Sequence, residues 1–419
     1  MAVTAQRSLA STLLVLFGVV CGFVIAEGVA RLTLDSPQGY ALYSKERNEA
    51  HTSLAKLVSD PRLGHHLEPH APGHDARGFR NEASVDITDV VAIGDSQTWG
   101  INVRREEAWP AVLAKSSHLN VYSMALGGWG PPQYEVLARD AMALGPKAIL
   151  IGLYFGNDIF DSCSAIYSAK SSHKYRRSDR DLSPALMELQ SRLKLADNQA
   201  RGTLVREQVD RMGAVAKLWQ RLAGRSLLLQ ILMTRGWLPG IPSVDELYET
   251  GDKAWALEHP NAAVAYTNGK VSTVMTYGYR GVALDRENLC IQEGIRITRE
   301  VLASLRELGE TTHIRMGVVL IPTKESIYAA ADEAVLSHAP KEFAELVRHE
   351  AETKEELQDW CKRLALVCID AADRLVAAAR NGAILYKADS DGHPVAEGYR
   401  QIAYAGQDAL IAVGLLGAR

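Results

Sequence analysis

Residues 89–98 read DVVAIGDSQT. The four apolar residues from Val90 to Ile93, bounded by turn-forming residues, are typical of a buried strand in a parallel sheet. Ser96 follows where this strand turns into the next helix. A hydroxyl at that turn faces the crevice where α/β sheets bind ligands, beside the positive end of the helix. The other role open to Ser96 is that of a helix N-cap.

Strands and helices alternate along the rest of the chain. We expect strands at 89–94, 120–126, 147–155, 314–321, 365–369 and 383–386. We expect helices at 106–115, 131–144, 287–308, 341–363 and 394–413. This alternation predicts an α/β fold, in which a parallel sheet carries helices on both faces.

The chain divides into segments of different character. The predicted core occupies residues 89–161 and 286–419, and a mostly helical insertion at 162–285 interrupts it. An irregular, polar lead-in at 32–88 precedes the core, and residues 1–31 form a separate N-terminal segment.

The composition is that of an ordinary folded protein. With 47% hydrophobic and 23% charged residues in 419, the chain is neither disordered nor collagen-like. A net charge of −4 gives no general basic field, which argues against nucleic acid as the main partner. The five cysteines contain no C-x-x-C pair, which argues against a zinc ribbon.

The N-terminal segment holds 19 uncharged residues from Ser8 to Ala26. As a helix this run would span about 28 Å, close to the hydrocarbon thickness of a bilayer. We expect an uncleaved transmembrane anchor, because the run is longer than the apolar region of a usual signal peptide. A cleaved signal peptide is the alternative. The expected location is the cytoplasmic membrane, with a single pass and the soluble part outside the cytoplasm.

Two further segments lie at the predicted carboxyl ends of the next two strands. GGWG at 127–130 has a bare backbone that can offer an N–H to a developing oxyanion. FGND at 155–158 places the side-chain amide of Asn157 at the same edge. A tetrahedral acyl-transfer intermediate needs two or three such fixed donors. Each segment alone is more often a turn, but together with Ser96 they predict an acyl-transfer site.

A serine nucleophile needs a base, and an imidazole needs a carboxylate that fixes its tautomer. DSDGHP at 389–394 supplies both. We expect His393 to act as the base and Asp391 to hold its ring, with Asp389 as the reserve carboxylate. A lone histidine before a helix is usually structural, so this assignment depends on Ser96.

These four segments, in this order, resemble blocks I, II, III and V of the SGNH (GDSL-like) hydrolases. The resemblance implies a flavodoxin-like three-layer α/β/α sandwich. It also implies that Ser96 is the nucleophile and that Asp391 and His393 complete the triad. Ser96, Gly128 and Asn157 then form the oxyanion hole, and neither a cofactor nor a metal is implied.

The sequence departs from the family pattern at several positions. Gln97 stands where the named motif has Leu, and Phe155 stands where Gly usually opens block III. Ser123 stands where an Asn is common, which leaves Gly127 as a rival to Gly128. These departures keep open an alternative, a catalytically silent SGNH module that binds glycan or scaffolds an envelope complex.

The Asp-x-His spacing at 391–393 resembles the family branch that O-acetylates cell-envelope polysaccharides. RGFRN at 77–81 and IPTKESIY at 321–328 are similar to membrane-anchored bacterial members. The resemblance implies an esterase or O-acetyltransferase that acts on an acylated glycan or exopolysaccharide. The partners so implied are an acylated carbohydrate or other small ester, the membrane, and an envelope biosynthesis complex.

Four histidines of the lead-in lie within ten residues. They are His65, His66, His70 and His74. Their spacing matches no zinc-ligand pattern, so we expect a solvated loop, with a metal site as the alternative.

The cysteines allow two pairings in an oxidising compartment, Cys163 with Cys290 and Cys361 with Cys368. The alternative is that they are small buried hydrophobic residues.

Overall fold

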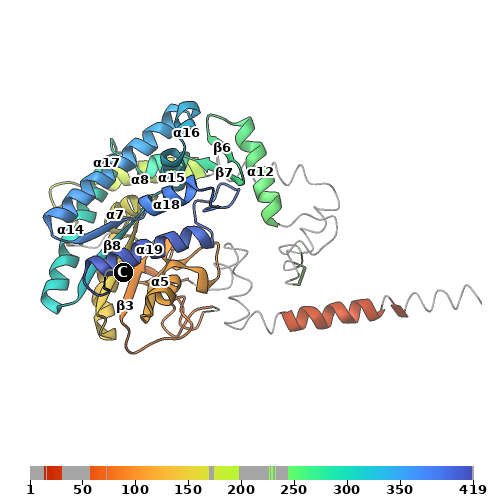
Figure 1. Cartoon of the computed structure of the whole chain (residues 1–419), viewed down its shortest axis with the longest axis horizontal. Helices are drawn as coiled ribbons and strands as arrows, with labels where there is room; N and C mark the ends of the chain where they lie inside the picture. The colour runs from red at the N-terminus through yellow and green to blue at the C-terminus, as the bar shows by residue number, and fades with distance from the viewer. Residues whose placement is uncertain are drawn as a thin grey trace, which may run out of the picture.

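A parallel five-stranded sheet forms the centre of the computed structural model (Figure 1). The structure describes residues 14–15, 17–30, 57–71, 73–168, 174–197, 226, 228–229, 232 and 244–417. The strands are β3 (Val90–Gly94), β4 (Val121–Ala125), β5 (Ala148–Tyr154), β8 (Arg315–Ile321) and β9 (Val367–Asp370). Their order, β4-β3-β5-β8-β9, is that of a flavodoxin-like doubly wound sheet, so the predicted α/β fold is confirmed.

Alternate residues of the strands face two different cores. In β3, Val91 and Ile93 join one apolar cluster while Val90 and Ala92 join the other, and all four are fully buried. The first face is covered by α6 (Pro131–Asp140), α7 (Asp158–Tyr167) and α14 (Leu289–Thr312). The second face is covered by α5 (Trp109–Ser117) and α19 (Ala396–Ala412). Burial on both faces explains why the strand sequences are apolar throughout.

The core contains further helices besides these. They are α4 (Ser96–Trp99), η1 (Arg105–Glu107), η2 (Ala141–Leu144), α15 (Lys324–Ala331), α16 (Glu333–His338), α17 (Lys341–Arg363) and α18 (Ala372–Arg380).

The insertion contains a β-hairpin besides its helices. The helices of its described part are α8 (Ser183–Asp197), α12 (Val244–Glu258) and α13 (Gly278–Ala283). The strands β6 (Ala263–Asn268) and β7 (Val271–Thr276) pair antiparallel, and the prediction of a mostly helical segment missed them. Gly269 has a φ of 59° and opens the two-residue loop between them, a position where hairpins favour glycine.

Two local predictions are wrong. The lead-in was predicted to be irregular, yet it contains an antiparallel hairpin of β1 (Leu57–Asp60) and β2 (Gly64–Leu67). Residues 383–386 were predicted to form a strand, but they make only an isolated bridge between Tyr386 and Pro394. This segment pairs with the chain just before α19 rather than with the sheet, and Leu385 accepts the Val395 N–H at 2.8 Å.

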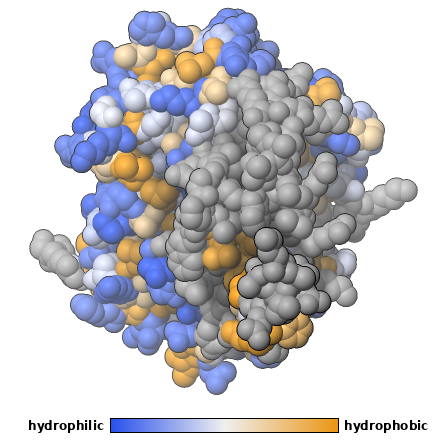
Figure 2. Space-filling model, turned by 90° about the vertical axis from the view of Figure 1, so that its right-hand side faces the viewer, coloured by the Kyte–Doolittle hydropathy of each residue, from blue (hydrophilic) through white to orange (hydrophobic). Residues whose placement is uncertain are grey.

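The described residues of the N-terminal run are helical, without interruption from 17 to 30. Their large apolar side chains are exposed, and Figure 2 views the molecule from the side on which this helix lies. Within the described ranges, no helix is both long and apolar enough to cross a membrane. The predicted anchor begins at Ser8, outside the described residues, and the structure gives it no support.

Both cysteine pairs considered from the sequence form disulfides in the structure. Cys163–Cys290 joins α7 to α14, and Cys361–Cys368 joins α17 to β9. The first bond closes a loop with a sequence separation of 127, and the second closes one of 7. Cross-linking distant residues removes more entropy from the unfolded chain than cross-linking near ones.

Replacing Cys163 and Cys290 together by alanine is therefore expected to lower the free energy of unfolding by about 4 kcal/mol. The matched double variant of Cys361 and Cys368 is expected to lose about 2 kcal/mol, because its loop is short. Urea unfolding of the two variants and the oxidised wild type measures both losses. Equal losses would contradict the loop-length argument.

Candidate active site

Ser96 begins α4 directly after the carboxyl end of β3. Asp95, which is wholly buried, caps this helix by accepting the Gln97 N–H at 2.9 Å, so the N-cap role falls to Asp95 and not to Ser96. Gly94 lets the Thr98 side chain of α4 pack closely against the end of β3, because a Cβ on residue 94 would collide with the Thr98 hydroxyl. The Ser96 hydroxyl is thus left free of a capping role at the edge where β3, β4 and β5 end.

The structure brings Ser96, His393 and Asp391 together. The Nε2 atom of His393 lies 2.9 Å from Ser96 Oγ, although the two residues are far apart in the sequence. On the other side of the ring, Nδ1 lies 2.7 Å from Asp391 Oδ1. The Ser96 hydroxyl is also 3.2 Å from Asp95 Oδ2, a second acceptor for its proton. A hydroxyl, an imidazole and a carboxylate therefore form one hydrogen-bonded chain.

Asn102 is hydrogen-bonded to the Asp391 end of this network of hydrogen bonds. The sequence analysis did not identify this residue. Its Nδ2 donates to Asp391 Oδ2 at 2.8 Å and to the main-chain oxygen of His393 at 3.1 Å. Asn102 has a φ of 73°, a conformation that asparagine tolerates better than most residues. The guanidinium of Arg80 fixes the same loop by donating to the carbonyls of Trp99 (3.0 Å) and Val103 (2.8 Å).

The two candidate carboxylates differ in their environments. Burial opposes the charge of Asp391, but the charge of His393 and hydrogen bonds from His393 and Asn102 hold its pKa well below the usual range. Burial, and then repulsion by Asp391, raises the pKa of Asp389 to about 6. Asp389 Oδ1 accepts the main-chain N–H of Asp391 at 2.9 Å. Asp391 is therefore the anion that faces the imidazole, and Asp389 braces the loop.

The bend at residues 127–130 lies beside Ser96. A Cβ on Gly127 would lie 3.5 Å from the Cβ of Ser96, which places the 127–130 bend against the serine. Gly128 has a φ of 81° and lies against His65. In the described part of the chain, the three N–H groups of Ser96, Gly127 and Gly128 have no hydrogen-bond acceptor.

Asn157 lies at the start of α7, next to the buried carboxyl group of Asp158 and the half-buried one of Asp161. Its Nδ2 donates to Asp161 Oδ2 at 2.5 Å, and an amide nitrogen has a second hydrogen to offer. Asp158 accepts from the Tyr134 hydroxyl at 3.0 Å and from the Tyr154 N–H at 2.8 Å.

Burial, the largest cause in each case, raises the pKa of Asp161 to about 8 and that of Asp158 well above its ordinary value. The Asp161 carboxyl is thus mostly neutral at neutral pH, which keeps its negative charge away from the Asn157 amide. Burial also raises the pKa of Asp95, to about 6.

Three of the lead-in histidines form hydrogen bonds with different partners. His65 Nε2 lies 3.1 Å from the Gly127 carbonyl, which ties the β1–β2 hairpin to the 127–130 bend. His66 Nδ1 lies 2.6 Å from the Leu67 carbonyl, and His74 Nε2 accepts from the Trp99 indole at 3.2 Å. In the described part of the chain, no three His, Cys, Asp or Glu side chains gather as a metal site requires.

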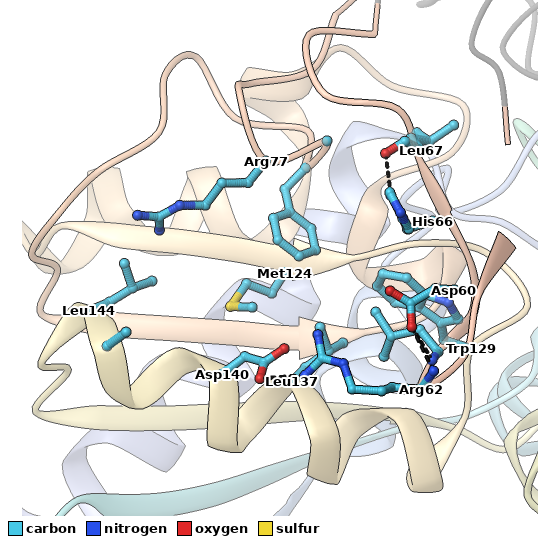
Figure 3. Close-up of a pocket in the computed structure, with 14 residues that line it drawn as sticks. Asp60, Arg62, His66, Leu67, Arg77, Met124, Trp129, Leu137, Asp140 and Leu144 are labelled. Carbon is cyan, nitrogen blue, oxygen red and sulfur yellow. Dashed lines mark hydrogen bonds and ion pairs between the residues drawn. The ribbon is translucent and has the colours of Figure 1, made fainter. Parts of the chain in front are cut away.

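A pocket of about 390 Å³ lies between the β1–β2 hairpin, β4 and α6 (Figure 3). Its lining includes Met124, Trp129 and Leu137, with Arg62 and Asp140 paired at 2.8 Å. Trp129 belongs to the 127–130 bend, but neither Ser96 nor His393 lines this pocket. It is therefore separate from the hydrogen-bonded chain.

No family model matches the chain, and no curated protein matches its sequence. A lipolytic protein of the G-D-S-L family from Desulfitobacterium hafniense resembles it in structure, with a TM-score of 0.35, 14% identity, and 77% of this chain and 99% of that chain covered. A member of the lipolytic protein G-D-S-L family from Veillonella parvula has a TM-score of 0.34 and 12% identity. The match covers 76% of this chain and 96% of that chain. An extracellular lipase from Streptomyces rimosus has a TM-score of 0.33 and 12% identity. The match covers 77% of this chain and 99% of that chain.

Proposed function

We propose that the protein is a serine-dependent esterase or O-acyltransferase. The observation that carries this proposal is the chain of hydrogen bonds from Ser96 Oγ through His393 to Asp391, at 2.9 and 2.7 Å. A serine beside a base, and a base held by a carboxylate, are the parts of an activated nucleophile. Metal-assisted hydrolysis on the lead-in histidines has no comparable observation in its favour.

In the proposed reaction His393 Nε2 takes the proton of Ser96 as Oγ attacks the ester carbonyl, and Asp391 stabilises the imidazolium. The Ser96 N–H, the Gly128 N–H and the Asn157 amide receive the oxyanion, with Gly127 as the rival donor. Collapse of the intermediate breaks the ester C–O bond, and the leaving alcohol takes the proton from His393. Water or a sugar hydroxyl, deprotonated by His393, then attacks the acyl-serine and restores the enzyme.

We also propose that the site acts in the cell envelope on an acylated glycan or exopolysaccharide. The Asp-x-His spacing at 391–393 supports the substrate class. The uncharged run at 8–26 and the two disulfides support a place outside the cytoplasm, where disulfides persist. Whether the acyl group passes to water or to a sugar depends on how well the site excludes water.

The full chain, purified in detergent, should be assayed for acetate release from an acetylated oligosaccharide and for acetyl transfer to an unacetylated one. Release alone identifies an esterase, and transfer identifies an acyltransferase. Turnover of neither, together with no turnover of a small acetyl ester, would contradict the proposal and favour the catalytically silent module.

Asp161 is expected to set an alkaline limit on activity. As the pH rises through about 8, this carboxyl loses its proton and places a negative charge beside the Asn157 amide. The charge opposes the oxyanion, so kcat is expected to fall about tenfold or more. D161N keeps a neutral acceptor for Asn157 and is expected to keep its kcat at alkaline pH. An unchanged alkaline limb in D161N would show that another group causes it.

A further inference from the structure

Lys324 is a fully buried cation at the start of α15. Its Nζ donates to the main-chain oxygens of Val274 (2.7 Å), Asp389 (3.0 Å) and Asp391 (2.8 Å). The Thr273 hydroxyl is a fourth acceptor at 3.2 Å. Within the described ranges, no carboxylate oxygen lies within ion-pair distance of this ammonium. A buried ammonium is costly unless it is fully hydrogen-bonded, and here carbonyl dipoles provide those bonds.

These acceptors belong to two segments that are far apart in the chain. Thr273 and Val274 lie on β7 of the insertion, while Asp389 and Asp391 lie on the loop before α19. Further bonds join the same segments, since the Val274 N–H donates to the Asp389 carbonyl at 3.3 Å and Thr273 Oγ1 donates to the Lys387 carbonyl at 2.8 Å. Lys324 thus lies at the junction of the insertion and the loop that carries Asp391.

The loop at 387–393 has no helix or strand of its own, so its shape depends on the groups that bind its main chain. Asp252 of α12 accepts the Ser390 N–H at 2.7 Å. Arg280 of α13, paired with Glu325 at 2.8 Å, packs against Gly392, where a Cβ would collide with the guanidinium. Each residue of the loop from 389 to 392 is therefore contacted by the insertion or by α15.

We propose that Lys324 is a positioning residue, which holds the loop carrying Asp391 and His393 against the β6–β7 hairpin of the insertion. This inference rests on the proposed function. It gives the insertion a part in the active site that needs no contact with substrate. It also assigns a role to the IPTKESIY segment, because Lys324 is the residue of that segment that reaches the triad loop.

The test is K324M, which keeps the length of the side chain and removes the ammonium. Without it the carbonyls of Val274, Asp389 and Asp391 each lose the hydrogen bond from Lys324 and the loop shifts, so kcat is expected to fall about 100-fold while KM changes little. Fluorophosphonate labelling of Ser96 is expected to slow by a similar factor. The acid limb of the kcat/KM profile is expected to move to higher pH, since a positive charge is lost beside the Asp391–His393 pair.

Other charged groups near Lys324 also act on the pH profile. The charged groups around Lys324 are Glu325 on its own helix, Arg280 on α13, and Asp389 and Asp391 on the loop. None of the others is altered by K324M. A purely structural lysine would lower the melting temperature and leave kcat per folded molecule, the labelling rate and the acid limb unchanged.

Two matched variants complete the experiment. T273V keeps the side-chain shape and removes the hydroxyl that bonds Lys324 and the Lys387 carbonyl, so a smaller fall in kcat at constant KM is expected. K147M breaks the Lys147–Asp89 ion pair of 2.7 Å at the amino ends of β5 and β3, the opposite edge of the sheet, and is expected to keep the wild-type kcat.

Folded K324M and T273V with wild-type kcat, labelling rate and pH profile would overturn the inference. If K324M does not fold, T273V decides alone, and an unchanged kcat overturns the inference. A wild-type chain that hydrolyses no ester and is not labelled at Ser96 overturns the proposed function, and with it this role of Lys324. Wild-type turnover with unaffected variants overturns only the role of Lys324, so the two failures are distinguishable.

Discussion

Replacing Ser96 with alanine is expected to lower kcat for ester hydrolysis by about 10⁵- to 10⁶-fold. The hydroxyl removed is the one that lies 2.9 Å from His393 Nε2, and no other side chain takes that position in the structure's described part. Because the main-chain N–H of residue 96 remains, the oxyanion donors stay in place and a small residual rate above water is expected. The measurement is single-substrate kinetics on the full chain with a small acetyl ester.

The same substitution is expected to abolish labelling by a fluorophosphonate probe, which bonds to Ser96 Oγ with loss of fluoride. S164A is the matched control, since Ser164 lies on α7 and, among the described residues, its hydroxyl is hydrogen-bonded only to that of Ser168. S164A should keep full labelling and full turnover. Persistent labelling of S96A would place the nucleophile elsewhere and remove the basis of the proposed reaction.

The core strands were predictable because a doubly wound sheet buries both faces of its strands. The strand expected at 147–155 is β5, Ala148–Tyr154, and every residue of it is buried. The helix expected at 341–363 has the bounds of α17. Alternation of such strands with amphipathic helices allows few strand orders in a parallel sheet. The observed order, β4-β3-β5-β8-β9, is one of them.

The hairpins were harder to predict because they are not part of that alternation. Residues 263–276 hold an Asn-Gly pair between two runs with β-branched and aromatic residues, a hairpin signal that was missed within the insertion, which as a whole was expected to be mostly helical. The apolar residues at 383–386 resemble a strand, yet the segment turns back to pair with Pro394. Only tertiary pairing distinguishes these cases, since the local residue pattern is that of a strand in both.

The residues of the proposed triad were easier to predict than those that hold them in place. Ser96, Asp391 and His393 lie in short motifs whose residue types are required by the reaction, and the structure brings them within hydrogen-bond distance. Asn102 and Lys324 act by donating to carbonyl and carboxylate oxygens of a distant loop. Such contacts leave no spacing pattern in the sequence, because any donor of the right reach serves.

Replacing Asp391 with asparagine is expected to lower kcat by about 10⁴-fold while the protein stays folded. Asp391 accepts from His393 Nδ1 with one carboxylate oxygen and from Asn102 Nδ2 with the other. An amide has a single oxygen, so one of these two donors would face an NH₂ group and lose its acceptor. The imidazole then loses its fixed tautomer, and the imidazolium loses its counter-charge.

D389N is the matched variant, because it makes the same chemical change two residues earlier in the same loop. Asp389 contacts the main-chain N–H of Asp391 and not the imidazole, and an amide oxygen can replace that contact. We expect a loss of kcat of about tenfold or less, far below that of D391N. The low pKa of Asp391 keeps it ionised across the neutral range, whereas Asp389, with a pKa of about 6, gains a proton at the acid side of that range, so the two losses should be compared above pH 7. A larger loss in D389N than in D391N would transfer the orienting role to Asp389 and require a different loop conformation in the active enzyme.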